Sequence, residues 1–459
     1  MKRCLLLFLA VLATSHPVAG DVAYWVWERT KPLSAQEAAQ LKAADVSRLY
    51  WQAGTMTTDG AHWKWRERFP IDWTALHRGG TTPAIIPVLR LEPPEGQGLP
   101  ETTFPELEAM VNALIEESGG KEMQIDYECP DRLVPNYIRF LRHLKESGRT
   151  WRLSISALGH WSKYADQFSG LADEITPMFY DLNPHRESLG AGMLPPLLNV
   201  TSVASEITGW KNCPLPWRAG LPNFSRLTLV DKSGLSLGNI RRWGWDDIWF
   251  SPLLKPASAT TDGETCFDVQ STGVMASTPM QPGEHVVARH PDRDALQSVL
   301  STVATSGAEG PIYFRLAGAD DMSGFSPVDL AQEKIAPPKF RVQSDASSRI
   351  ILTNVTATDL MPRVFGDAPG QRGYCLVLRA ESSIWRDVLP GEFSAVSAGN
   401  DYGMDGVTLR FRFSHLAAGQ SIKTGLAERA PLSGSALVSW RIDNVDKENV
   451  WHELESAQR

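Results

Sequence analysis

The sequence predicts an α/β fold, a (β/α)8 TIM barrel with an insertion, followed by a C-terminal all-β sandwich-like domain. Over residues 21–336, eight β-rich segments alternate with amphipathic helical segments, and parallel β-α units of this number close most readily into a barrel. Over residues 337–459, apolar and polar residues alternate between clusters of Gly, Asp, Asn and Ser, a pattern typical of antiparallel sheets.

The barrel strands are predicted at residues 23–28, 48–54, 83–91, 122–128, 151–158, 174–182, 218–225 and 311–318. A helix over residues 35–44 follows a capping box formed by Ser34 and Glu37. Three further segments place apolar residues at helical spacing and stop before a glycine. These helices are expected at residues 105–118, 135–147 and 292–306.

The region between the last two barrel strands is too long for one loop and one helix. Residues 232–292 contain GWDDIWFSPLL and a stretch rich in Gly, Thr and Ser, and we interpret them as an insertion. An alternative makes DDIWFSPLL, residues 246–254, a barrel strand itself.

The N-terminus has the pattern of a Sec-type signal peptide over residues 1–20. Lys2 and Arg3 precede an apolar run that is too short to span a bilayer, and Gly20 is a small residue at the expected cleavage site. The mature protein is therefore expected to be periplasmic or secreted, without a membrane span. Export permits disulfides, and Cys213 with Cys266 is the favoured pair, although sequence leaves the connectivity open.

The charge and the missing motifs exclude several classes of protein. Loss of Lys2 and Arg3 with the signal peptide changes the formal net charge from −8 to −10, which argues against nucleic acid as a partner. There is no C-x-x-C, HExxH or glycine-rich phosphate loop, so that we expect no metal site and no cofactor. The sequence leaves the oligomeric state open.

The segment EMQIDYECP, residues 122–130, places Gln124, Asp126 and Glu128 on one face of a predicted strand. The carboxyl ends of barrel strands carry the active site. Two carboxyls held close in a partly desolvated mouth resist double ionisation, so that one can stay protonated and act as a general acid. Glycosidic cleavage needs such an arrangement. A salt-bridged structural pair is the alternative interpretation.

Three short motifs resemble glycoside hydrolase family 18, the chitinases and endo-N-acetylglucosaminidases. Residues 125–128, IDYE, are similar to the end of the family's Asp-x-x-Asp-x-Asp-x-Glu strand. Residues 178–181, MFYD, resemble its Met-x-Tyr-Asp, and residues 220–226, GLPNFSR, resemble its Gly-Ile-Pro-x-Tyr-Gly-Arg. Over most of the barrel, the sequence also resembles a bacterial family known as domain of unknown function 3142, and this match is closer.

The resemblance implies a carbohydrate substrate and a substrate-assisted retaining mechanism. Glu128 would protonate the leaving oxygen and later act as base toward water. Asp126 would orient the acetamido group of the substrate, and Tyr180 would hydrogen-bond its oxygen. Asp181 and Met178 would shape the sugar pocket.

Two departures from the family concern specificity for N-acetylhexosamine rather than sugar chemistry in general. Gln124 stands where the family has an aspartate, which makes it a candidate contact in a pocket of lower charge. Phe314 and Arg315 occupy the region of the family's last-strand tryptophan.

Aromatic and basic residues near predicted strand ends supply further candidates for substrate binding. Trp27, Trp51 and Trp161 are placed to stack on sugar faces, and Arg90 and Arg226 are candidate polar contacts. Two other functions stay open at this point. One is a lectin-like barrel that binds glycan without turnover, and the other is a structural role in an envelope complex.

Overall fold

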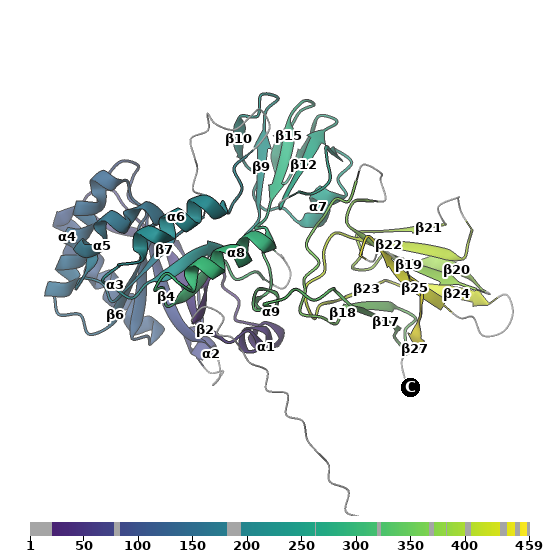
Figure 1. Ribbon diagram of the computed structural model, residues 1–459, viewed down its shortest axis with the longest axis horizontal. Helices are drawn as coiled ribbons and strands as arrows, with labels where there is room; N and C mark the ends of the chain where they lie inside the picture. Colours follow the sequence, from purple (N-terminus) through teal and green to yellow (C-terminus); the bar gives the residue numbers. More distant parts are fainter. Residues whose placement is uncertain are drawn as a thin grey trace, which may run out of the picture.

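The protein folds into a closed parallel barrel, an inserted antiparallel sheet and a C-terminal pair of sheets (Figure 1). The computed structural model describes residues 21–77, 83–180, 194–261, 263–318, 323–366, 371–381, 383–399, 405–431, 438–445 and 450–456. The predicted signal peptide lies outside the described residues.

The barrel consists of eight parallel strands in the order in which they follow one another along the chain. They are β1 (Val22–Val26), β2 (Val46–Thr58), β4 (Ala84–Leu91), β5 (Glu122–Asp126), β6 (Arg152–Leu158), β7 (Glu174–Met178), β8 (Arg218–Pro222) and β16 (Gly310–Phe314). Strand β1 pairs with both β2 and β16, which closes the sheet. The predicted barrel and its eight strands are confirmed.

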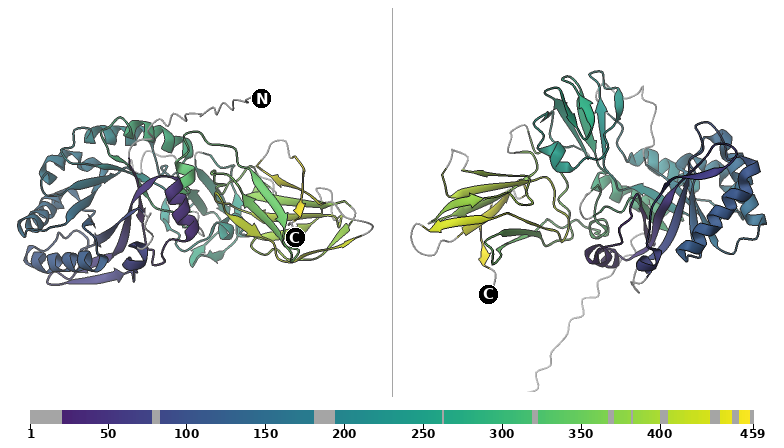
Figure 2. Two further views of the ribbon diagram at one scale, coloured as in Figure 1. Left: turned by 90° about the horizontal axis from the view of Figure 1, so that it is seen from below. Right: turned by 180° about the vertical axis from the view of Figure 1, so that it is seen from behind.

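Helices cover the outside of the barrel, as Figure 2 shows from two sides. They are α1 (Ala35–Ala43), α2 (Trp73–His77), α3 (Phe104–Ser118), α4 (Val134–Glu146), α5 (Ala165–Phe168), α6 (Val200–Trp210) and α8 (Arg293–Val303). The predicted capping box is present, since the Ser34 side chain accepts from the backbone of Glu37 and the Glu37 side chain accepts from Ser34. Helix α3 ends at Gly119, whose φ of 63° favours glycine. The outward side chains of the strands and the inner faces of these helices form the main apolar core.

The half of the barrel interior at the amino ends of the strands is polar and ionic. Arg218, which is 1% exposed, reaches Glu174 Oε2 with Nε at 3.3 Å and Asp21 Oδ2 with Nη2 at 2.8 Å. The hydroxyl of Tyr50 donates to the same Glu174 carboxylate, and Ser154 Oγ donates to it at 3.3 Å. Buried charges need such partners, so these residues replace an apolar plug in this part of the barrel.

The insertion between β8 and α8 forms an antiparallel sheet of its own, in the order β10-β9-β15-β12-β11. Its elements are β9 (Arg226–Val230), β10 (Ser236–Asn239), α7 (Trp245–Trp249), β11 (Leu254–Pro256), β12 (Glu264–Val269), β13 (Gly273–Met275), β14 (Thr278–Met280) and β15 (His285–Arg289). The alternative that made residues 246–254 a barrel strand is wrong. These residues start within α7, where Trp245, Ile248 and Trp249 are buried at helical spacing.

The C-terminal region contains two sheets with one shared core. The first holds β17 (Phe340–Ser344), β18 (Ile350–Asn354), β23 (Ser421–Lys423) and β27 (Glu455–Ser456); the second holds β19 (Tyr374–Ala380), β21 (Ala395–Ala398), β22 (Thr408–Phe413), β25 (Val438–Asp443) and β26 (His452–Glu453). A two-stranded antiparallel sheet of β20 (Ser383–Val388) and β24 (Ala427–Pro431) lies beside them. Val342 and Leu352 of one sheet share an apolar cluster with Leu376 and Phe411 of the other. The predicted antiparallel, sandwich-like region is confirmed.

Asp359 ties the barrel to the C-terminal region through buried hydrogen bonds. Its carboxylate accepts from the backbone of Ser326 at 2.6 Å and from the backbone of Ala418 at 2.7 Å. Ser326 is the N-cap of the short helix α9 (Pro327–Leu330), whose Asp329 pairs with Arg293. Burial, together with the neighbouring Asp329 carboxyl, raises the pKa of Asp359 to about 7.

This raised pKa predicts how stability depends on pH. The folded state binds the Asp359 proton more tightly than the unfolded chain does, so this group's contribution is complete below the unfolded pKa of about 4 and is lost as pH rises to about 7. In the wild-type protein, the free energy of unfolding should fall by on the order of a few kcal/mol between these pH values. In Asp359→Asn, which has no titrating group at this position, we expect this fall to be absent. Urea denaturation of both proteins at pH 4.5 and 7.5 measures the difference. An equal pH dependence in the two proteins would contradict the assignment.

The described cysteines Cys129, Cys213, Cys266 and Cys375 are all free thiols. The favoured Cys213–Cys266 disulfide is therefore wrong. Cys213 follows helix α6 on the barrel, whereas Cys266 lies on β12 of the inserted sheet. Within the described ranges, the helices are too short or too polar to cross a bilayer.

Candidate active site

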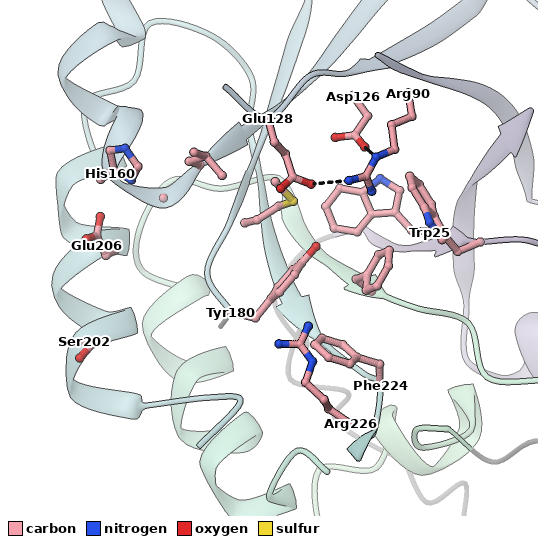
Figure 3. A pocket seen from close by; sticks show the side chains of 15 residues that line it. Trp25, Arg90, Asp126, Glu128, His160, Tyr180, Ser202, Glu206, Phe224 and Arg226 are labelled. Atoms are coloured by element: carbon pink, nitrogen blue, oxygen red, sulfur yellow. Dashed lines mark ion pairs between the residues drawn. The ribbon is translucent and has the colours of Figure 1, made fainter. Parts of the chain in front are cut away.

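A cavity of about 710 Å³ opens among the carboxyl ends of the barrel strands (Figure 3). This is where active sites of parallel barrels lie, and the volume is in the range of small-molecule sites. Of the residues predicted from the sequence, the cavity lining includes Trp27, Arg90, Asp126, Glu128, Met178, Tyr180 and Arg226. Four barrel strands or their following loops thus bring these predicted residues to one place, together with the start of β9.

The two acids differ in exposure although they lie two residues apart. The Asp126 side chain, at the end of β5, is 6% exposed, whereas the Glu128 side chain is 42% exposed. Ser156 Oγ donates to Asp126 Oδ1 at 2.5 Å from the neighbouring strand β6. Glu128 therefore faces the open cavity, and Asp126 lies at its base.

Arg90 lies between the two acids, as Figure 3 shows. Its Nε lies 3.9 Å from Asp126 Oδ2 and its Nη2 lies 4.0 Å from Glu128 Oε1. Its shortest ion pair, 2.7 Å, is with Glu92 Oε1. The guanidinium also lies over the Trp27 ring, 5.9 Å from its centroid, which fixes the cation beside an aromatic wall.

Burial and neighbouring charges have opposite effects on the pKa values of Asp126 and Arg90. Burial raises the pKa of Asp126, and the Arg90 charge and the Ser156 hydrogen bond oppose that rise without cancelling it. For Arg90, burial by itself would lower the pKa, but the carboxyls of Asp126, Glu128 and Glu92 outweigh it and raise the value. Perturbed carboxyls in a concave site are typical of functional residues. The arrangement can hold a proton at Asp126 beside a permanent positive charge.

Arg90→Gln tests this coupling. Removing the positive charge should raise the pKa of Asp126 further, because the Arg90 charge is the largest effect that lowers it. We expect the protonation midpoint of Asp126 to move to higher pH in Arg90→Gln. NMR titration of the aspartate side-chain carboxyl carbons is the measurement. Arg139→Gln, in an exposed ion pair with Glu101 on the outside of the barrel, is the matched control, and an unmoved Asp126 midpoint in Arg90→Gln would contradict the coupling.

Gln124 lies below the cavity and does not line it, which corrects its prediction as a substrate contact. It is 0% exposed. Its Oε1 accepts from Trp25 Nε1 at 2.6 Å, and its Nε2 donates to Ser154 Oγ and Thr176 Oγ1, both at 3.0 Å. The amide is thereby held in the barrel interior, where its neutral donor suits two hydroxyl acceptors.

Aromatic rings form one wall of the cavity. The Tyr180 ring stacks on Phe314 at 5.7 Å between centroids and meets Phe224 edge-on at 5.8 Å. Trp27 also contacts Phe314 edge-on, at 5.4 Å. In Figure 3, the Tyr180 hydroxyl points toward Glu128, and Arg226 lies beside Phe224 at the lower rim. Flat rings next to acids suit the apolar faces of a sugar.

Two of the three tryptophans predicted as sugar platforms do not reach the cavity. Trp51 and Trp161 are both 0% exposed. Trp51 lies on the outer face of β2 and donates to the backbone of Arg29, and Trp161 stacks on Phe168 in the helical layer. A ring without exposed area cannot stack on a ligand, so these predictions are wrong. Asp181 lies outside the described residues.

Several lining residues were missed as site candidates. Ser202 and Glu206 come from helix α6 and His160 from the turn after β6, where its Nε2 lies 2.8 Å from Asp131 Oδ1. Phe224 and Trp25 complete the aromatic wall. Among these residues, only His160 and Trp25 could have been found from the sequence, by their position near predicted strand ends. Helix α6 has no motif that marks Glu206 as part of a site. The described residues contain no group of three or more metal-ligating side chains.

Comparison with solved structures finds distant matches in barrel proteins. The spore cortex-lytic enzyme SleL of Bacillus megaterium QM B1551 has 11% identity and a TM-score of 0.42, covering 67% of this chain and 72% of SleL. A family 18 chitinase from Cycas revoluta, solved with (GlcNAc)3, has 13% identity and a TM-score of 0.40, covering 64% and 94%. The human pseudo-chitinase YKL-39, with retained chitooligosaccharide binding, has 10% identity and a TM-score of 0.42, covering 69% and 98%. No protein-family model and no curated protein matches the chain by sequence.

Proposed function

We propose that this protein is an exported glycoside hydrolase with Glu128 as its acid/base. The observation that carries the proposal is the placement of Glu128, 42% exposed, in a cavity of about 710 Å³ above the buried Asp126. An envelope scaffold needs no acid facing an open cavity, so the arrangement favours a ligand over a purely structural role.

The proposed reaction follows the substrate-assisted scheme that the sequence motifs imply. Glu128 gives its proton to the glycosidic oxygen as the bond to the anomeric carbon breaks. The acetamido oxygen of the substrate forms the new bond to that carbon, with Asp126 orienting the acetamido group. Water then attacks the anomeric carbon as the bond from that carbon to the acetamido oxygen breaks, and Glu128 takes a proton from the attacking water. This second displacement restores the acetamido group and the protonated Glu128, and the configuration is retained. Tyr180 supports the acetamido oxygen, and the aromatic wall holds the sugar.

The experiment is a screen of the mature protein against aryl glycosides, with and without a 2-acetamido group, and against bacterial polysaccharides. We expect hydrolysis with retention: the anomeric carbon of the product should have the same configuration, α or β, as in the substrate. Proton NMR early in the reaction measures this configuration. An inverted product would exclude the proposed mechanism, and turnover of sugars without a 2-acetamido group would exclude substrate assistance.

Glycan binding without turnover is the second candidate, and Gln124 favours it. Its amide lies where the resembling family has a second acid, and three hydrogen bonds hold it in place. Asp126 therefore has no acid beneath it with which to share a proton. In this case, the wild-type protein and Glu128→Gln should bind the same glycan with equal affinity and hydrolyse none.

A further inference from the structure

A second cavity, of about 640 Å³, lies between the inserted sheet and the C-terminal sheets. One wall comes from α7 and β11 of the insertion, and the other from β21 and β22, which lie beside α7 in Figure 1. Domain interfaces are common places for ligand sites. This cavity shares no lining residue with the candidate active site.

The two walls are joined by direct contacts. Trp249 Nε1 donates to the backbone of Arg363 at 3.0 Å, and Ser394 Oγ donates to Asp246 Oδ2 at 2.5 Å. Phe250 packs against Gly373, where an added Cβ would lie 3.4 Å from the ring. The cavity is thus built into the fold and needs no ligand to form it.

The charged side chains among the described lining residues are all basic, namely Lys255, Arg372 and Arg412. Within the described parts of the chain, no carboxylate lies within ion-pair distance of Arg372 or Lys255. Asp268, the cross-strand neighbour of Lys255, pairs instead with His285 at 3.0 Å. The lining of this cavity therefore carries positive charge, although the formal net charge of the protein is −8.

The acid that α7 directs toward the C-terminal sheets already has two hydrogen-bond partners. Asp246 accepts the hydroxyls of Ser394 and Ser414, one on each carboxylate oxygen. Burial and the nearby Arg412 guanidinium together lower the pKa of Arg372. A bound anion would relieve this repulsion between like charges.

The remaining lining suits a saccharide. Phe250 offers an aromatic edge, and Gln270 and Ser397, both exposed, offer neutral hydrogen-bonding groups. Arginine is well suited to bind a carboxylate or phosphate through two parallel hydrogen bonds. We propose that this cavity is a second binding site that takes an anionic saccharide and holds its carboxylate or phosphate group against Arg372 and Lys255.

The test is isothermal titration of the full mature chain with three probes: tri-galacturonate, glucose 6-phosphate and the neutral maltotriose. We expect at least one anionic probe to bind, with an affinity that falls about tenfold in Arg372→Gln and in Lys255→Gln and also falls as ionic strength rises. The response to the two anionic probes distinguishes carboxylate from phosphate. Lys255 is exposed, so Lys255→Gln keeps the test valid where Arg372→Gln fails to fold.

Two controls separate this site from the barrel. Lys42→Gln removes an exposed lysine of helix α1 and should leave binding unchanged, and so should Glu128→Gln. The proposal is overturned if neither anionic probe binds, or if binding is insensitive to Arg372→Gln and Lys255→Gln. It is also overturned if maltotriose binds with the same sensitivity to those two substitutions. None of these outcomes depends on hydrolysis at Glu128.

Discussion

Glu128→Gln should lower kcat on a hydrolysed polysaccharide by at least about 10³-fold, because the amide cannot protonate the leaving oxygen. The side chain keeps its size, and its surroundings in the cavity are unchanged, so the dissociation constant for the glycan should change by less than about threefold. The measurements are steady-state kinetics and titration of the same substrate. Circular dichroism of the variant checks that the fold is intact.

The leaving group provides a sharper test of the same assignment. A 4-nitrophenyl leaving group departs without much protonation, whereas a sugar alcohol needs it. The loss caused by Glu128→Gln should therefore be much smaller on the 4-nitrophenyl glycoside than on the polysaccharide. Glu116→Gln, on the exposed face of α3, is the matched control and should leave both rates unchanged. Equal losses on the two substrates would contradict the role of Glu128 as general acid.

Arg218→Met should cost about 3–5 kcal/mol in the free energy of unfolding, because it leaves Glu174 buried without its closest cation. Glu174 is 1% exposed at its side chain, and its other guanidinium neighbour, Arg48, is farther away at 3.8 Å. Methionine fills much of the space of the arginine stem, so the loss reports mainly on charge. Urea denaturation followed by tryptophan fluorescence measures it.

The double variant Arg218→Met with Glu174→Gln decides whether the charge is the cause. Neutralising Glu174 should restore part of the lost stability, since the uncompensated carboxylate is then gone. If the losses of stability in Arg218→Met and Glu174→Gln simply add in the double variant, the effect comes from packing and not from the charge. Arg139→Met is a useful comparison, because its ion pair with Glu101, at 2.7 Å, is exposed on both sides, 46% at the arginine and 55% at the glutamate, and should contribute less.

The order of strands and helices could be predicted from the sequence because each element carries its own local signal. Apolar segments of strand length, the capping box at Ser34 and the glycines after helices depend only on neighbouring residues. The placement of Asp126 and Glu128 at one strand end follows from the same local pattern. The sequence could not decide whether residues 246–254 form a barrel strand, because a short apolar run is compatible with both a strand and a helix. In the structure, this segment starts within α7, and Leu254 begins β11.

The sequence by itself determined that two carboxyls two residues apart end the fourth barrel strand, and that the strands form a barrel. Only the tertiary structure decided which side chains face the cavity. Barrel strands are covered on both faces, by the interior and by the helices. The inward face here carries aromatic residues such as Trp25 beside buried polar residues such as Gln124, so hydrophobicity alone does not mark it in the sequence. Trp27 thus lines the cavity while Trp51 packs outward. Glu206 joins the site from a helix, because closure of the barrel brings together residues that no local pattern connects.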